Sequence, residues 1–256
     1  MVRLNEVPLF DQAATYLGNL NEYVAKVCND LAAHPILSTA QAIDALGLSQ
    51  GGLFLRAYVQ RCNKPQVRSL VTFGTPHNGI MEFRECTDTD LVCRATMALL
   101  HTNKWSDFAQ SWLVPAQYFR SPSNGYESYL EHSNFLADIN NERESKNMTY
   151  AKNLASLEKL AVYMFEEESV VLPKDSSWFD EVNGTEITPL RQRQLYLQDW
   201  IGLRQLDQDG GLDLRAVPGD HMQLTTELLM ETFREYYGPL KSMMPEPLNI
   251  FNNADL

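Results

Sequence analysis

The amino-acid sequence predicts an α/β fold, a mostly parallel β-sheet covered by helices on both faces. Two short apolar runs, residues 42–48 and 68–73, are each followed by a glycine-containing turn, which is typical of buried strands. Further apolar runs at 160–165 and 212–217 extend a series in which strands alternate with helical stretches. Strands separated by helices favour a parallel sheet, because each crossover returns the chain to the same end of the sheet.

The composition restricts the class of protein. The chain has 256 residues, 44% of them hydrophobic, which suits one large globular domain. Thirty-three acidic and 21 basic residues give a formal net charge of −12, so we expect neither nucleic acid nor a polybasic membrane contact. No apolar run approaches the roughly 18 residues of a transmembrane helix. The first residues also lack the segments of a secretory signal peptide.

The helices can be assigned in order along the chain. Residues 19–32 carry apolar side chains at helical spacing, which predicts a helix before the first strand. Residues 52–62 predict a helix directly after that strand. Several amphipathic stretches within 85–160 predict a helical insertion, and 225–237 predict a closing helix.

The carboxyl-terminal end of the chain differs in composition from the rest. Residues 239–256 are rich in proline, asparagine and methionine, so we expect a flexible tail there. We find no internal repeat and no low-complexity linker in the sequence. The sequence therefore predicts a single domain over residues 1–238, followed by the tail.

The segment Gly47-Leu48-Ser49-Gln50-Gly51 lies between a predicted strand and a predicted helix. A nucleophilic serine is held on such a turn, because small flanking residues let the backbone cross itself closely and expose the hydroxyl. The alternative is a glycine-rich turn without chemistry, but the strand–turn–helix order favours a nucleophile. The backbone N–H of Gln50 is then the expected donor to an oxyanion.

A nucleophilic serine needs a base and an acid that orients the base, and in this architecture they follow in the order serine, acid, histidine. His221 lies in a loop between the last predicted strand and the closing helix, so it is the expected base. The alternative is a solvent-exposed loop histidine. His34 precedes the serine, His77 is interpreted as a hydrogen-bonded structural residue, and His101 and His132 are expected at the surface.

The acid is less clear from the pattern. Glu166, Glu167 and Glu168 follow the third predicted strand directly, and a run of three acids is usually a solvated loop. Asp175 and Asp180 compete for the same role. The residues alone therefore leave the acid open.

Cysteines and glycosylation sequons suggest an oxidising compartment. Four cysteines allow three full disulfide pairings, between which the sequence does not choose. Their spacing does not fit a zinc site, and we expect no metal ion or organic cofactor. The residues concerned are Cys28, Cys62, Cys86 and Cys93, with sequons at Asn147 and Asn183.

Several stretches between about residues 20 and 237 together resemble one known family. They are Gly47-Leu48-Ser49-Gln50-Gly51-Gly52, Phe54-Leu55-Arg56, Gln60-Arg61-Cys62, Asn134-Phe135-Leu136-Ala137-Asp138-Ile139-Asn140, Glu142-Arg143, Ser176, Trp178-Phe179, Leu195-Tyr196, Gln198-Asp199, Gly202-Leu203, Gly219-Asp220-His221 and Gln223-Leu224. In these segments the chain resembles the palmitoyl-protein thioesterase family, lysosomal enzymes that remove fatty acyl groups from cysteine. The resemblance implies an α/β-hydrolase fold with a helical insertion.

The resemblance also implies roles for individual residues. It makes Ser49 the nucleophile and His221 the general base. The family normally has an aspartate before a Ser/Thr-x-Val-x-Pro segment, and here Glu168 holds that position. A glutamate also serves as a triad acid in this fold.

Beyond the triad, the resemblance concerns covalent features and compartment. It implies the pairings Cys28–Cys62 and Cys86–Cys93. Asn147 matches a glycosylation position of the family, whereas Asn183 has no counterpart. It further implies a lysosomal, vacuolar or secreted protein.

One departure from the family concerns the amino terminus. The family begins with a strand that ends in a Trp-His-Gly-like loop, whose backbone supplies one oxyanion donor. Nothing before residue 20 resembles that loop. We therefore expect a chain that lacks its first strands and retains Gln50 as one donor.

The expected function is hydrolysis of long-chain fatty acyl thioesters on S-acylated proteins or peptides. The acyl chain requires an apolar groove, and the insertion offers candidates to line it, although for each residue taken singly we favour the alternative of core packing: Phe108, Trp112, Leu113, Tyr118 and Phe119. One alternative is a carboxylester lipase, which shares the serine turn and the Gly-Thr-Pro-His loop. Another is a catalytically inactive member that binds acyl chains or a partner.

Overall fold

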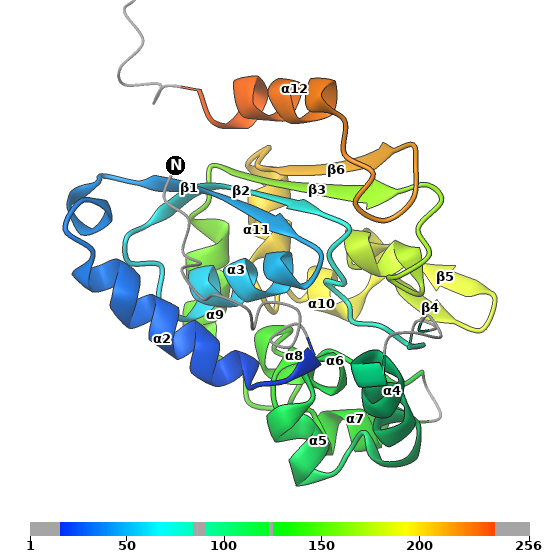
Figure 1. Cartoon of the computed structure of the whole chain (residues 1–256). Helices are drawn as coiled ribbons and strands as arrows, with labels where there is room; N and C mark the ends of the chain where they lie inside the picture. The colour runs from blue at the N-terminus through cyan, green and yellow to red at the C-terminus, as the bar shows by residue number, and fades with distance from the viewer. Residues whose placement is uncertain (1–15, 84–85, 87–90, 123–124, 239–256) are drawn as a thin grey trace, which may run out of the picture. The chain divides into compact units, whose positions relative to one another are not determined.

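The computed structural model describes residues 16–83, 86, 91–122 and 125–238 (Figure 1). The chain divides into two compact units, Met1–Gln223 and Leu224–Leu256. The first unit contains the sheet, and the second contains helix α12 (Thr226–Tyr236), where a helix is predicted. The predicted tail at 239–256 lies outside the described residues. Most of the segment before residue 20, where we expect the first strand and loop of the family to be missing, also lies outside them.

A four-stranded parallel sheet forms the centre of the first unit, as predicted (Figure 1). Its order is β1-β2-β3-β6, and each strand coincides within a residue or two with a predicted apolar run. The bounds are β1 (Ile43–Leu48), β2 (Val67–Phe73), β3 (Lys159–Phe165) and β6 (Leu212–Val217). Because the strands are parallel, the loops that follow them open at one common edge.

Helices pack on the sheet through their apolar positions. Helix α3 (Gln50–Arg61) contacts β1 and β2, and it also packs against α2 (Leu20–Ala33) and α9 (Met148–Ala155) (Figure 1). Helix α11 (Leu203–Gln208) contacts β6. The predicted helices before and after the first strand are confirmed. Together with the parallel sheet, they give the chain an α/β-hydrolase fold.

Between β2 and β3 the described chain is helical, and it contains no further strand of the sheet there. None of the described helices is long and apolar enough to span a bilayer. Besides α9, the helices of this stretch are α4 (Leu91–Asn103), α5 (Asp107–Trp112), α6 (Val114–Gln117), α7 (Tyr126–His132) and α8 (Leu136–Ile139).

The stretch between β3 and β6 contains a hairpin that the sequence reading did not predict. Strands β4 (Glu181–Asn183) and β5 (Glu186–Thr188) pair antiparallel around Gly184, whose φ is 63°. The positive φ explains why a glycine stands in this turn. The short helices of the stretch are η3 (Lys174–Trp178), η4 (Leu190–Gln192) and α10 (Gln194–Leu197), and η1 (Leu37–Thr39) precedes β1.

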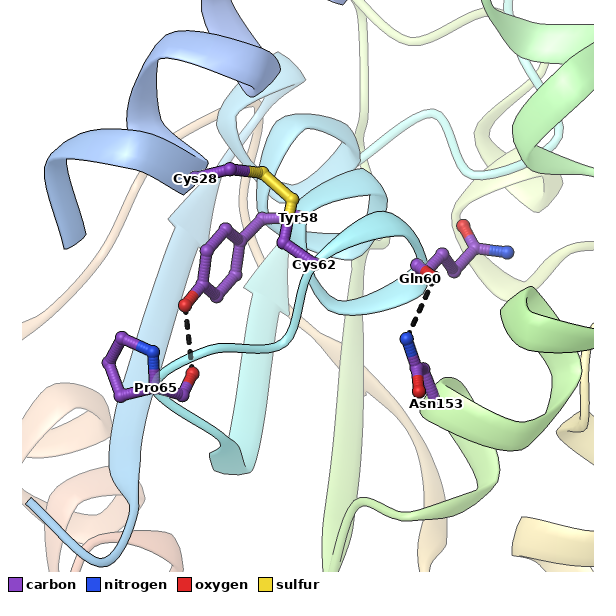
Figure 2. Close-up of a disulfide and its surroundings, with 6 residues drawn as sticks. All are labelled: Cys28, Tyr58, Gln60, Cys62, Pro65 and Asn153. Atoms are coloured by element: carbon purple, nitrogen blue, oxygen red, sulfur yellow. Dashed lines mark hydrogen bonds between the residues drawn. A yellow bond between two sulfur atoms is a disulfide. The ribbon is translucent and has the colours of Figure 1, made fainter. Parts of the chain in front are cut away.

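A disulfide connects the two helices on either side of β1. Cys28 on α2 is bonded to Cys62 at the end of α3 (Figure 2). Beside it, the hydroxyl of Tyr58 donates a hydrogen bond to the carbonyl of Pro65 at 2.8 Å (Figure 2). These contacts fix the carboxyl-terminal end of α3, the helix that begins directly after Ser49.

The second disulfide joins Cys86 to Cys93, at the start of α4. Both pairings are those implied by the family resemblance.

On the side of α3 opposite the Cys28–Cys62 disulfide, the side chain of Asn153 donates to the backbone carbonyl of Gln60 at 3.0 Å (Figure 2). Helix α3 is therefore held to its neighbours on two sides.

Candidate active site

Ser49 lies on a strained turn between β1 and α3. Its φ of 52° and ψ of −131° are unusual for a residue with a side chain. Its N–H donates to the carbonyl of Phe73 at 2.8 Å, and its carbonyl accepts from the hydroxyl of Thr75 at 2.8 Å. The N–H of Gly52 also donates to that carbonyl, at 3.0 Å. Residues at and directly after the end of β2 therefore form hydrogen bonds with both the N–H and the carbonyl of Ser49.

The flanking glycines are not equally required. A Cβ at Gly47 would meet the Cα of Gly52 at 2.5 Å, and a Cβ at Gly52 would overlap the side chain of Thr75. A Cβ at Gly51 would meet no atom within 4 Å. The close backbone crossing therefore requires Gly47 and Gly52, whereas Gly51 of the motif faces open space.

His221 stands between Ser49 and Glu168. Its Nε2 lies 3.0 Å from the Ser49 Oγ, and its Nδ1 lies 2.8 Å from the Glu168 Oε2. The Glu168 side chain is fully buried, and that of His221 is largely buried. The three side chains come from the ends of β1, β3 and β6, which share one edge of the parallel sheet. This arrangement allows a base to activate a serine hydroxyl while an acid orients the base.

The second oxygen of Glu168 is also hydrogen-bonded. Its Oε1 accepts from the backbone N–H groups of Val170 at 2.8 Å and Val171 at 2.9 Å. The turn that follows β3 therefore holds the carboxylate from one side while His221 contacts it from the other. Both oxygens of the carboxylate therefore have hydrogen-bond partners.

The competing acids take other positions. Glu166 and Glu167 are exposed, and the Glu167 carboxylate accepts from the N–H of Gly219. Asp175 lies in η3, and Asp180 accepts from the N–H of Leu190 at 2.7 Å.

Asp220 connects the loop of the acid to the loop of the base, a role that the sequence reading missed. Its carboxylate accepts from the Ser169 N–H at 3.0 Å, from the Ser169 hydroxyl at 2.7 Å and from the His221 N–H at 2.6 Å. These hydrogen bonds, that of the Ser169 hydroxyl above all, lower the pKa of Asp220. The sequence offered a signal for this contact, because Asp220 directly precedes His221 and Ser169 directly follows Glu168.

His77 is a structural residue, in agreement with its interpretation from the sequence. It is fully buried, with its Nε2 3.0 Å from the Thr72 hydroxyl and its ring stacked on Phe179. Burial, together with the nearby charge of Arg56, lowers the pKa of His77 well below its ordinary value. The other three histidines neither line the cavity beside Ser49 nor contact Ser49: His34, His101 and His132.

Gln50 begins helix α3 and borders the same space as Ser49. The first N–H groups of a helix have no acceptor within the helix, and the helix dipole favours negative charge there. The hydroxyl of Tyr118 donates to the Gln50 side chain at 3.4 Å. The backbone N–H of Gln50 is thus available to an oxyanion formed next to Ser49.

A cavity of about 460 Å³ opens beside Ser49 and His221. Its volume falls within the range of small-molecule sites, and its wall is mainly apolar. Besides these two residues, it is lined by Tyr16, Leu48, Gln50, Gly51, Pro76, Ile80, Phe83, Met97, Pro115, Tyr118, Val170 and Val171.

Most of the candidates for the groove do not line the cavity. Of the five candidates only Tyr118 lines the cavity. Phe108 and Trp112 are 58% and 59% exposed, because they share the outer face of the short helix α5. Leu113 and Phe119 are buried in neighbouring apolar clusters instead.

Much of the actual wall comes from segments that no pattern had connected to the site. Helix α4 contributes Met97, the loop after β2 contributes Ile80 and Phe83, and the acid loop contributes Val170 and Val171. Among the described residues, no group of three or more His, Cys, Asp or Glu side chains is placed to hold a metal ion.

Comparison of the sequence with known proteins assigns the chain to a family. The model of the family described as palmitoyl protein thioesterase matches residues 1–221. Palmitoyl-protein thioesterase 1 of Caenorhabditis elegans is 36% identical over 225 residues, which cover 87% of this chain and 74% of that protein. Palmitoyl-protein thioesterase 3 of Dictyostelium discoideum is 36% identical over 208 residues, 79% of this chain and 68% of that protein.

More distant relatives complete the comparison. The lysosomal thioesterase PPT2 homolog of Drosophila melanogaster is 30% identical over 71% of this chain and 62% of its own length. A lipase-esterase related protein from Clostridium acetobutylicum aligns with a TM-score of 0.41 at 10% identity, over 85% of this chain and 75% of that one. The fold assignment rests on the sheet and its helices rather than on that alignment. The chain belongs to the palmitoyl protein thioesterase family.

Proposed function

We propose that this protein is a serine hydrolase that cleaves long-chain fatty acyl thioesters from S-acylated cysteines of proteins or peptides, with Ser49, His221 and Glu168 as its triad. The observation that supports this most is the hydrogen-bonded series from Glu168 through His221 to Ser49 at the edge of an apolar cavity. The names of the relatives, which are palmitoyl-protein thioesterases, support the substrate class.

In the first half of the reaction, the Ser49 Oγ attacks the thioester carbonyl carbon while the His221 Nε2 accepts the hydroxyl proton. Glu168 stabilises the resulting imidazolium through Nδ1. The Gln50 N–H donates to the oxyanion of the tetrahedral intermediate. The C–S bond then breaks, the imidazolium returns its proton to the departing sulfur, and an acyl ester remains on Ser49.

In the second half, water replaces the thiol. The neutral His221 accepts a proton from a water molecule while the water oxygen attacks the ester carbonyl carbon. The resulting imidazolium protonates the Ser49 Oγ as the bond between Oγ and the acyl carbon breaks. The products are the free fatty acid and the original enzyme. The chemistry of these residues needs no metal ion or organic cofactor.

The cavity accommodates the acyl chain in this proposal. Its apolar wall begins at the nucleophile with Leu48 and continues through Ile80, Met97 and Val171. Burial of a long alkyl chain against these side chains favours long-chain substrates, because each buried methylene contributes about 0.8 kcal/mol.

Compartment and modification belong to the same proposal. Relatives named lysosomal thioesterases, among them the Drosophila protein, favour a lysosomal location for this chain. Asn147 and Asn183 are both exposed, so their sequons are accessible to glycosylation.

Substrate assays and an active-site probe test the proposal. The wild-type protein is expected to release thiol from a palmitoyl-peptide thioester and to react with a fluorophosphonate probe, whereas Ser49→Ala does neither. Faster hydrolysis of a matched oxygen ester would favour a carboxylester lipase instead. Failure of Ser49 to react with the probe would favour an inactive, binding member of the family.

A further inference from the structure

We propose that Val170 and Val171 couple occupancy of the acyl cavity to the position of the triad acid, so that a long acyl chain raises kcat as well as affinity. This inference rests on the proposed thioesterase function. It names two positioning residues for that reaction and a reason for chain-length preference.

The backbone of these two residues holds the acid. Their N–H groups are the two donors to Oε1 of Glu168, at 2.8 and 2.9 Å, while Oε2 faces His221 at 2.8 Å. Glu168 is fully buried, so water does not replace either donor. A shift of these N–H groups would therefore shift the carboxylate and, through it, the imidazole.

The side chains of the same residues form part of the cavity wall. Val171 is only 2% exposed and packs in a cluster with Ile80 and Phe119, and Val170 is half-buried. Both line the space that begins at Ser49. One short segment thus contacts the acid through its backbone and the acyl space through its side chains.

The segment is tied down on both sides. Before it, the carboxylate of Asp220 accepts from both the N–H and the hydroxyl of Ser169. After it, the carbonyl of Leu172 accepts from the N–H of Met81 at 2.8 Å. Between these anchors, the backbone N–H groups of Val170 and Val171 donate to Glu168, and their side chains border the cavity.

The energetic consequence follows from packing. An acyl chain that reaches these valines adds dispersion contacts on the side of the segment that otherwise faces the open cavity. Such contacts restrict the two N–H groups to the position that orients Glu168. Binding energy from a remote part of the substrate then serves the reacting groups, and a shortened substrate loses kcat and not only affinity.

The test compares hexanoyl and hexadecanoyl thioesters of one peptide. For the wild-type protein we expect a higher kcat for the hexadecanoyl substrate. In Val171→Ala, that kcat should fall about tenfold toward the hexanoyl value, because two methyl groups no longer contact the chain. The kcat for the hexanoyl substrate should fall by a smaller factor, because a short chain makes fewer contacts with the cavity wall.

Met97→Ala provides a matched control from another part of the wall. Met97 lines the cavity from α4, whereas the N–H donors to Glu168 Oε1 belong to Val170 and Val171. Its truncation should raise KM for the hexadecanoyl substrate while preserving the ratio of the two kcat values. Val171→Leu, which restores an apolar contact, should recover most of the long-chain kcat.

The outcomes separate the inference from the function on which it rests. Equal kcat for both substrates in the wild type, or an equal loss for both in Val171→Ala, would overturn the coupling. In that case Ser49 would still react with a fluorophosphonate that carries no long chain, and the proposed function would stand. If neither thioester is hydrolysed and Ser49 is not labelled, the proposed function and the coupling both fail.

Discussion

Replacement of Glu168 by glutamine tests the triad through its hydrogen-bond donors. The N–H groups of Val170 and Val171 require an oxygen at the Oε1 position, so they fix the new amide with its oxygen toward them. The amide nitrogen then faces Nδ1 of His221. The opposite orientation of the amide would place its NH₂ group against two buried N–H donors. Each N–H left without an acceptor would cost about 1–3 kcal/mol of free energy.

This orientation reverses the tautomer of His221. Nδ1 must accept from the amide, so the ring proton moves to Nε2, which faces the Ser49 Oγ at 3.0 Å. A protonated Nε2 does not accept the serine proton. We expect kcat to fall about 10³–10⁴-fold, approaching the roughly 10⁴-fold loss observed when a triad histidine is held in the wrong tautomer. At 1.36 kcal/mol for each factor of ten, the barrier rises by about 4 to 5 kcal/mol.

The assay measures thiol release from a palmitoyl-peptide thioester at saturating substrate. Glu166→Gln is the matched control, because Glu166 follows the same strand but is exposed. It should retain kcat within about twofold, as surface substitutions usually do. A loss of less than tenfold in Glu168→Gln, or equal losses in the two variants, would remove Glu168 from the triad.

Four further predictions have defined outcomes. Ser49→Ala should abolish hydrolysis and probe labelling without changing the denaturant concentration at the unfolding midpoint; unchanged turnover would exclude Ser49 as the nucleophile. Thr75→Val removes the hydrogen bond to the Ser49 carbonyl and should lower kcat about fivefold, whereas Thr75→Ser should retain it; equal kcat values would contradict this role. The pKa of His77 is lowered in the folded protein, so as the pH falls below about 6.5 only the unfolded chain binds a proton at this histidine. The free energy of unfolding should therefore decrease by up to about 1.4 kcal/mol for each pH unit. His77→Gln should reduce that slope. Joint replacement of Cys28 and Cys62 by serine opens a link across 34 residues and should cost about 4 kcal/mol in the unfolding free energy, a loss that denaturant titration would detect; an unchanged midpoint would contradict it.

Local sequence patterns were sufficient for the sheet strands and for the helices that flank β1. A strand of a parallel sheet is buried on both faces and so reads as a short apolar run, and helix α2 shows apolar side chains at helical spacing. The serine turn was recognisable for the same reason, since its strand, turn and helix are adjacent in the chain. The hairpin of β4 and β5 was missed, although Asn183 and Gly184 between short apolar-polar alternations are a known hairpin signal.

Other features depend on residues far apart in the sequence. The pattern left five carboxylates as candidates for the acid, and the family resemblance selected Glu168. Its 2.8 Å contact with His221 spans 53 residues and exists because β3 and β6 are neighbours in the sheet. The cavity wall likewise combines Met97, Ile80 and Val171 from three segments.

The sequence by itself therefore determined the strands, the serine turn and the order of the candidate site residues, because these are properties of contiguous segments. Only the tertiary structure decided which side chains line the cavity, how Asp220 joins the two loops and where the Glu168 carboxylate is held. Those properties are distances between atoms of separate segments, which are established when the parallel strands bring their ends to one edge.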